Sequence, residues 1–181
     1  MLIVGLGNPG EKYEKTRHNA GRMALEHFRK KNEFPEWEHD KKQNSLVSER
    51  DIDGISVVLL LPETFMNNSG LSLKSSTYNL EPSSLIVVHD DIDLPLGSMK
   101  IVFNRGSAGH KGVESIIAAL GTKEFARVRI GIAPRDAEGK LKKPREEEEV
   151  SKFVLKKFTA TEQKKMEEIF EKTSNALAMI L

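Results

Sequence analysis

The sequence contains no cysteine, and no apolar run approaches the roughly 18 residues that a membrane-spanning helix needs. The first absence excludes disulfides, thiolate nucleophiles and cysteine metal ligands, and it suits a reducing compartment. The N-terminal stretch also lacks the basic region of a secretory signal, and its apolar run is too short for one. We therefore expect a cytoplasmic protein that does not associate with membranes.

An excess of charge of either sign is also missing, because 28 Lys and Arg residues oppose 27 Asp and Glu residues. Bulk charge thus gives no evidence for a nucleic-acid partner, and a polyanion would have to bind a local basic face. The 181 residues suffice for one domain, which would bury roughly 70% of its unfolded surface. We predict a single domain over residues 1–181.

Short apolar runs alternate with helical patterns along the chain. The apolar runs, which are typical of strands covered on both faces, are residues 2–6, 55–61, 85–88, 99–103 and 128–132. The helical patterns are residues 20–28, 71–78, 113–120 and 166–177. This alternation predicts an α/β fold with a central mixed, largely parallel twisted sheet and helices on both faces. Residues 134–149 have no apolar period, and we expect a mobile surface loop there.

Polar residues follow the apolar runs and supply the functional groups that ester or amide hydrolysis requires. They include Asn8, His18, Asn67 and Asp90. Ligands of such sheets collect at the carboxyl ends of strands, so we expect these side chains to lie near one another. A histidine with an ordinary pKa near neutrality can take a proton from water, and amides can hold a carbonyl group without titrating.

The segment Gly5–Gly10 matches the dinucleotide motif G-x-G-x-x-G after a strand. A dinucleotide site needs a helix that begins inside the motif, so that its N–H groups face the pyrophosphate. Pro9 disfavours a helical backbone at Asn8, and no apolar stripe begins before Ala20. We therefore predict a tight loop that presents Asn8.

Residues 89–93 could form a metal cluster with His18 and His110, since they bring one histidine and several carboxylates. In an extended segment, however, Asp90 points to the opposite side from His89 and Asp91, so only one face could contribute ligands. The carboxylates could instead cap the turn that follows them. We predict no metal and no cofactor.

Five motifs appear in order over nearly the whole chain: GLGNPG-x-x-Y-x-x-TRHNAG, TFMNNSG, VVHDDIDLPLG, GSAGHKGVESI and RVRIGI. In this order they resemble the bacterial-type peptidyl-tRNA hydrolases. The resemblance implies a monomeric α/β enzyme that hydrolyses the ester between a peptide and the terminal ribose of tRNA. It implies peptidyl-tRNA as the partner and no obligate protein partner.

The chemistry expected within these motifs is direct attack by water, because the chain has no cysteine and no serine in a nucleophile-elbow pattern. His18 would be the general base, and Asp90 would hold its tautomer and favour the imidazolium that forms. Asn67 and neighbouring main-chain N–H groups would polarise the carbonyl. The alternatives are that His18 bonds to its own loop, that Asp90 belongs to a strand-end turn, and that Asn8 and Asn67 tie loops together.

The resemblance also implies binding residues. Asn8 matches the asparagine that distinguishes a blocked peptide from a free amino group. Tyr13 and Phe65 match aromatic positions around the tRNA end, and Met66 and Asn67 match positions that flank the catalytic histidine and the peptide. Considered alone, Met66 would more often fill a core.

A basic rim for acceptor-stem phosphates is predicted from Lys100, Arg105 and Arg129, of which Lys100 and Arg129 stand at basic positions of the family. Scattered surface cations are common, so the alternative is that these three residues are exposed to solvent and have no role in tRNA binding. The sequence departs from the family at Lys111, where the usual asparagine is replaced by a cation that can only donate hydrogen bonds. Lys111 would either contact a phosphate of the tRNA end or begin a helix and point into solvent.

The C-terminal helix predicted over residues 160–181 is roughly neutral, so we do not expect a basic-tail contact with tRNA. Two other functions stay open from the sequence. One is a non-catalytic RNA-binding relative with the same fold. The other is an esterase or amidase that acts on small N-acylated substrates without RNA.

Overall fold

A computed structural model describes residues 1–74 and 81–181 of the chain. Its strands are β1 (Leu2–Gly5), β2 (Glu38–Asp40), β3 (Ser45–Ile52), β4 (Ile55–Pro62), β5 (Leu85–Pro95), β6 (Met99–Phe103) and β7 (Ala126–Ala133). The described strands form one seven-stranded sheet in the order β2-β3-β4-β1-β5-β7-β6. The four central strands β4, β1, β5 and β7 are parallel, and the outer pairs are antiparallel. The predicted mixed sheet is confirmed.

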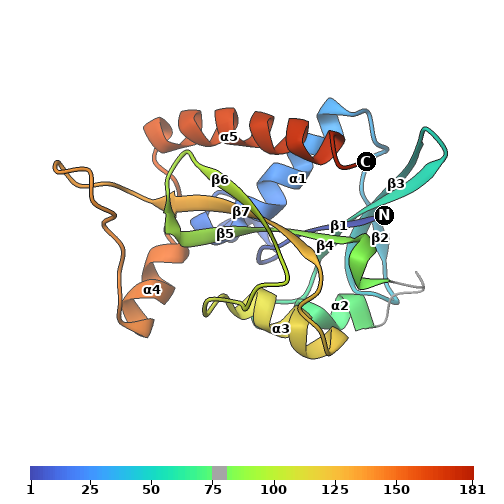
Figure 1. Ribbon diagram of the computed structural model, residues 1–181, viewed down its shortest axis with the longest axis horizontal. Helices are drawn as coiled ribbons and strands as arrows, with labels where there is room; N and C mark the ends of the chain where they lie inside the picture. Colours follow the sequence, from blue (N-terminus) through green and yellow to red (C-terminus); the bar gives the residue numbers. More distant parts are fainter. Residues whose placement is uncertain (75–80) are drawn as a thin grey trace.

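Helices lie on both faces of this sheet, as predicted (Figure 1). They are α1 (Ala20–Lys31), α2 (Gly70–Lys74), α3 (Lys111–Leu120), α4 (Glu147–Val154) and α5 (Ala160–Ala178), with short 3-10 turns η1 (Glu11–Tyr13), η2 (Arg17–Asn19), η3 (Met66–Asn68) and η4 (Pro82–Ser84). α1 and α5 cover one face and α2 and α3 the other (Figure 1). Ile3 packs into the core under α1 and α5, whereas Leu2 and Val4 belong to the core under α2 and α3. Because both faces are covered, such strands are apolar at successive positions.

The sequence prediction misses β2 and β3, which form the sheet edge beyond β4. Most residues of these two strands are exposed or half-buried, so they lack the continuous apolar run of the central strands. The predicted helix over residues 71–78 corresponds to α2 as far as Lys74, and its remainder lies outside the described residues.

Two predicted boundaries are wrong. β5 does not end at Val88 but continues to Pro95, because this stretch pairs with β7 as far as Asp91 and again at Pro95. The predicted loop over residues 134–149 ends early, because α4 begins at Glu147. The glutamates of its first turn are favourable there, since carboxylates at a helix N-terminus oppose the positive end of the helix dipole.

The approach of α1 to the sheet decides where the segment before it lies. The backbone of Gly21 is so close to the Val88 carbonyl oxygen and to Leu6 that any Cβ at this position would collide with them. The Arg22 N–H donates to the Leu6 carbonyl oxygen at 3.0 Å. This contact places η2, directly before α1, at the carboxyl ends of β1 and the first half of β5.

The G-x-G-x-x-G stretch forms a loop rather than a nucleotide-binding turn. Gly10 has a positive φ of 99° and is followed by the 3-10 turn η1. In the described chain no α-helix begins before Ala20. The expectation of a loop that presents Asn8 is therefore confirmed.

Candidate active site

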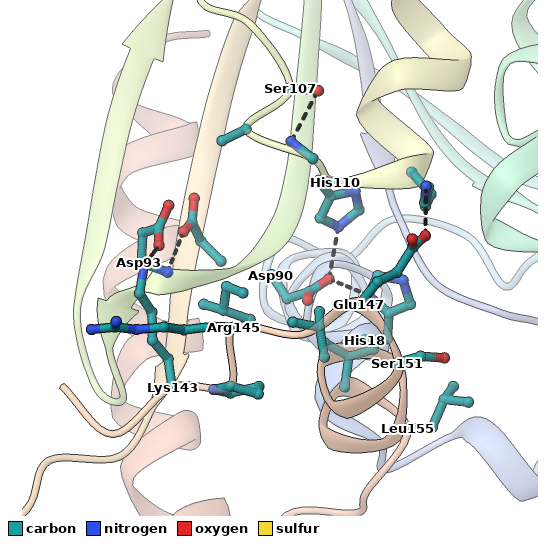
Figure 2. Close-up of a pocket in the computed structure, with 18 of the residues that line it drawn as sticks. His18, Asp90, Asp93, Ser107, His110, Lys143, Arg145, Glu147, Ser151 and Leu155 are labelled. Carbon is teal, nitrogen blue, oxygen red and sulfur yellow. Dashed lines mark hydrogen bonds and ion pairs between the residues drawn. The ribbon is translucent and has the colours of Figure 1, made fainter.

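A pocket of about 890 Å³ opens at the carboxyl ends of β1 and β5. Asn8, His18, Asp90 and His110 contribute to its lining, together with residues 91–93, 107–111 and 143–155 in part. Figure 2 shows His18, Asp90 and His110 meeting on one side of the pocket, while Asp93, Lys143 and Arg145 lie on the other. Three segments far apart in sequence thus converge on one carboxylate.

Asp90 is the centre of this cluster. Its Oδ1 atom lies 2.9 Å from Nδ1 of His18 and 2.9 Å from Nε2 of His110. The residue is 1% exposed. Burial would raise the pKa of the Asp90 carboxyl, but attraction to His18 and His110 and the hydrogen bonds from both rings hold that pKa well below its usual range. Asp90 is therefore an anion, and both ring nitrogens must donate to it.

The hydrogen bonds assign the protons on both histidines. His110 caps α3, and its Nδ1 accepts the Val113 N–H at 3.3 Å, so its proton is on Nε2, which donates to Asp90. His18 donates through Nδ1, which leaves the lone pair on its Nε2 without a contact to Asp90. Nε2 of His18 is thus the basic atom of the cluster.

Asp90 also sets the basicity of His18. Burial lowers the pKa of the His18 ring, while the charge of Asp90 and the hydrogen bond to it raise that pKa. The result is a pKa above the ordinary value of 6.5. A histidine whose basicity is increased in this way is better able to take a proton from water.

His89 lies on the other side of β5 from Asp90, as its position in an extended strand predicts. It is fully buried, and its Nδ1 donates to the Asp90 carbonyl oxygen at 2.7 Å. Burial lowers the pKa of the His89 ring well below its ordinary value, so the ring is neutral. Its ring packs against that of His110 with centroids 4.7 Å apart. His89 therefore supports His110 rather than contacting the pocket.

The sequence prediction does not give His110 its role beside Asp90. It names His110 only as a possible metal ligand. The available signal is the position of His110 directly before the apolar pattern of α3, where a side chain can accept a hydrogen bond from the helix N-terminus. No local pattern links His110 to Asp90, because the rest of β5, the strand β6 and the loop before α3 separate them in the sequence.

Asn8 is held by three hydrogen bonds. Its N–H donates to Asn19 Oδ1 at 2.8 Å, and Asn19 Nδ2 donates to the Asn8 carbonyl oxygen at 2.9 Å. Its Oδ1 accepts the Met66 N–H at 2.9 Å. Among the described residues, none accepts a hydrogen bond from Asn8 Nδ2. Because Asn8 lines the pocket, its NH₂ group can donate to a substrate carbonyl.

The aromatic and apolar residues implied by the resemblance lie beside the pocket rather than in it. Met66 is buried in the core under α2 and α3. Phe65 is 55% exposed and lies edge-on to the Tyr13 ring, with centroids 6.4 Å apart. Asn67 is exposed and is not among the residues that line this pocket, and its role in polarising a carbonyl stays a prediction.

The three predicted tRNA-contact residues differ in their surroundings. Lys100 and Arg105 are exposed, and Lys100 is opposite Arg129 across the β6 and β7 pair. Arg129 is half-buried and its Nε donates to Asp91. The cation of Arg129 is therefore already paired with a carboxylate.

Lys111 is the first residue of α3 and reaches the first residue of α4. Its Nζ lies 3.2 Å from Glu147 Oε1. The hydrogen bond and charge of Glu147 raise the pKa of Lys111. On the opposite rim Lys143 pairs with Asp93. Two exposed ion pairs thus connect the segment that carries α4 to the rest of the pocket.

His18, Asp90 and His110 are the described residues that could hold a metal ion, since their ligand atoms lie within 4.8 Å of one another. Both ring N–H groups already donate to the carboxylate oxygen, so an ion would have to displace two protons. The prediction that the site works without a metal stays a prediction.

The chain was compared with known proteins. Residues 2–181 match the family model described as peptidyl-tRNA hydrolase. The peptidyl-tRNA hydrolase of Lactobacillus johnsonii is 41% identical over 179 residues, which cover 97% of this chain and 90% of the relative. That of Aquifex aeolicus is 42% identical over 182 residues, which cover 97% and 87%.

A crystal structure of peptidyl-tRNA hydrolase from Acinetobacter baumannii superposes with a TM-score of 0.83 at 35% identity, over 94% of this chain and 82% of that one. In the described part of the chain, no helix is long and apolar enough to cross a membrane. The likeness to these relatives extends over nearly the full length of both sequence and fold. The chain belongs to the peptidyl-tRNA hydrolase family.

Proposed function

We propose that this chain hydrolyses the ester bond between a peptide and the 3′ ribose of tRNA, with His18 as the general base. Family membership supports the reaction and the substrate. The observation that supports the role of His18, which lines the pocket, is the hydrogen bond from its Nδ1 to Asp90, because this bond leaves the Nε2 lone pair without a partner among the described residues. We also place the reaction in the cytoplasm and expect a monomer.

In this mechanism a water molecule attacks the carbonyl carbon of the ester while His18 Nε2 takes one of its protons. Asp90 stabilises the imidazolium through the hydrogen bond to Nδ1. The Asn8 NH₂ group is the side-chain donor that could bind the oxyanion or an adjacent peptide carbonyl. Collapse of the tetrahedral intermediate breaks the bond to the ribose oxygen, which receives the proton from His18, and the peptide leaves as a carboxylic acid.

The test is to incubate the protein, without added metal, with N-acetylaminoacyl-tRNA, unblocked aminoacyl-tRNA and an ethyl ester of the same N-acetylamino acid. We expect rapid release of tRNA from the blocked substrate only. Equal hydrolysis of the ethyl ester at the same concentration would favour the small-ester hydrolase. Binding of tRNA with no hydrolysis of any substrate would favour the non-catalytic relative.

Asn8→Ala is expected to narrow the ratio of rates on blocked and unblocked substrates more than it weakens tRNA binding. The Asn8 NH₂ group can only donate, so it matches a peptide carbonyl but opposes the charged amine of an unblocked substrate. The measurement is kcat/KM on both substrates. An unchanged ratio would place the discrimination elsewhere.

Asn8→Asp is the matched variant, because it keeps an oxygen for the Met66 N–H and replaces the donor by a negative charge. We expect it to narrow the ratio further than Asn8→Ala does, since a carboxylate attracts an ammonium group. A ratio as large as that of the wild type would contradict the role of the NH₂ group.

Lys111→Asn is expected to flatten the dependence of log affinity for tRNA on log salt by up to about 0.7, the value for one phosphate of a single strand. Turnover at saturating substrate should change little, because the proposed contact acts in binding. A phosphate would have to replace Glu147 on the Lys111 ammonium. Salt titrations of both proteins measure the slope.

Glu147→Gln serves as the control for this exchange. It removes the competing carboxylate and leaves Lys111 free, so tRNA should bind more tightly at low salt. Superimposable slopes and equal affinities for all three proteins would show that Lys111 only begins its helix and pairs with Glu147.

A further inference from the structure

Arg17 precedes the catalytic histidine, and its side chain binds the junction between α4 and α5. Its Nη1 donates to the carbonyl oxygens of Lys156 at 3.2 Å and Lys157 at 3.0 Å. Its Nη2 lies 2.8 Å from each carboxylate oxygen of Glu162, in the first turn of α5. The residue is 7% exposed and does not line the pocket. A buried guanidinium with this many partners fixes two segments relative to each other.

Two aromatic rings and the backbone complete the junction. The guanidinium carbon of Arg17 lies 4.9 Å from the ring centroid of Phe153 and 5.3 Å from that of Phe158. The Arg17 N–H donates to the Lys156 carbonyl oxygen at 3.1 Å, and the Phe158 N–H donates to the Lys15 carbonyl oxygen at 3.0 Å. The segment before His18 is therefore paired, backbone to backbone, with the segment that follows α4.

The same α4 forms one wall of the pocket. Val150, Ser151 and Val154 of this helix line the pocket, as does Leu155 directly after it. Phe153, which packs on Arg17, belongs to the same helix. The Arg17 side chain thus joins the wall that a bound peptide would contact to the 3-10 turn that carries His18.

We propose that Arg17 is a positioning residue, which sets the distance between the α4 wall and His18 so that a peptide bound against the wall presents its ester to the base. The inference rests on the proposed role of His18. Arg17 suits this task because its planar guanidinium binds the Glu162 carboxylate through Nη2 and two backbone carbonyl oxygens through Nη1 at the same time, a fixed geometry that the single ammonium of a lysine cannot reproduce. A base displaced by about 1 Å from the reacting atoms can cost up to about 10²-fold in rate.

The pocket gives the proposal a consequence that depends on peptide length. Its volume of about 890 Å³ is larger than the volume of a single amino-acid residue, so a peptide of several residues can reach α4. Contacts between the peptide and α4 help catalysis only while α4 is held at a fixed distance from His18. Loss of the Arg17 contacts should therefore reduce the rate on a longer peptide more than the rate on a short substrate.

The test compares Arg17→Lys, Glu162→Gln and their double mutant on N-acetylaminoacyl-tRNA and N-acetyltripeptidyl-tRNA. Glu162 also accepts the Thr159 N–H at 2.8 Å, and a glutamine oxygen can keep this helix cap while it loses the ion pair. We expect each single variant to lower kcat on the longer substrate by about tenfold. The double mutant should be no slower than Arg17→Lys alone, because the contact between Arg17 and Glu162 is already broken in that variant.

Glu171→Gln is the matched control on α5, since it breaks ion pairs with His27 and Lys31 but does not touch the segment before His18. Its kcat should equal that of the wild type. The pH at which activity falls should be the same in all these variants, because Asp90 still holds His18.

Wild-type kcat on the longer substrate in Arg17→Lys and Glu162→Gln would overturn the proposal. So would additive losses in the double mutant, or equal losses in Glu171→Gln. A His18→Ala variant in the same assay separates this failure from that of the proposed function. If His18→Ala retains activity, the base assignment is wrong. If only His18→Ala is inactive, the base assignment stands and the role of Arg17 does not.

Discussion

Replacing His18 with alanine is expected to reduce the rate of peptidyl-tRNA hydrolysis by at least about 10²-fold, while tRNA binding stays near that of the wild type. The reason is that Nε2 of His18 is the atom that accepts a proton from water in the transition state, whereas binding depends on contacts made elsewhere. Single-turnover rates and equilibrium binding, measured separately, test both parts.

His39→Ala provides the control, because His39 is an exposed histidine on the edge strand β2. We expect it to have wild-type activity. Near-normal cleavage by a folded His18→Ala variant would contradict the assignment of His18 as the general base. A parallel loss of tRNA affinity would instead assign His18 a role in binding.

The sequence predicts the parallel core of the fold because its strands are apolar on both faces. That pattern marks β1, β4 and β5, and the positions of Leu2 and Ile3 show why, since successive residues enter different cores. The same rule misses β2 and β3 at one edge of the sheet, where much of each strand contacts water, but it finds β6 at the other edge because residues 99–103 are mostly apolar. It also misses α4, although Val150, Phe153 and Val154 repeat at helical spacing, because the glutamates before them are typical of a solvated loop.

The paired roles of His18 and Asp90 are predicted from their motifs, but the rest of the cluster depends on tertiary structure. Within Phe65–Asn68 the sequence cannot tell which side chain points inward. The 3-10 turn buries Met66 and exposes Asn67, and the carbonyl contact from Asn67 stays a prediction. Asn8, by contrast, is among the residues that line the pocket.

Ion pairs between residues that are distant in the sequence cannot be predicted from the sequence either. Arg129 is predicted as a phosphate contact, yet the parallel register of β5 and β7 brings it to Asp91, two residues along from its direct partner His89. Lys111 is likewise predicted at the rim, but only the position of α4 reveals that Glu147 competes for its charge. These two ion pairs show that a basic residue at a position suited to phosphate binding can already be paired with a carboxylate of the protein.

Replacing Asp90 with asparagine is expected to lower kcat/KM by roughly tenfold to 10²-fold and to shift the acidic limb of the pH profile to lower pH. The sign follows from the charge: Asp90 raises the pKa of His18, so the neutral amide lets that pKa fall. His18 is then free of its proton at lower pH, but it is a weaker base and is no longer held in one tautomer.

His110→Asn is expected to move the same limb in the opposite direction. Asparagine can still cap α3 through the Val113 N–H, but its shorter side chain gives up the bond to Asp90. The Asp90 charge then acts on His18 alone, which raises the pKa of His18, and activity is lost at a higher pH than in the wild type. Profiles of kcat/KM against pH for the three proteins measure both shifts. If the Asp90→Asn profile overlays that of the wild type at equal rate, Asp90 only shapes the strand end, and the two histidines do not act through it.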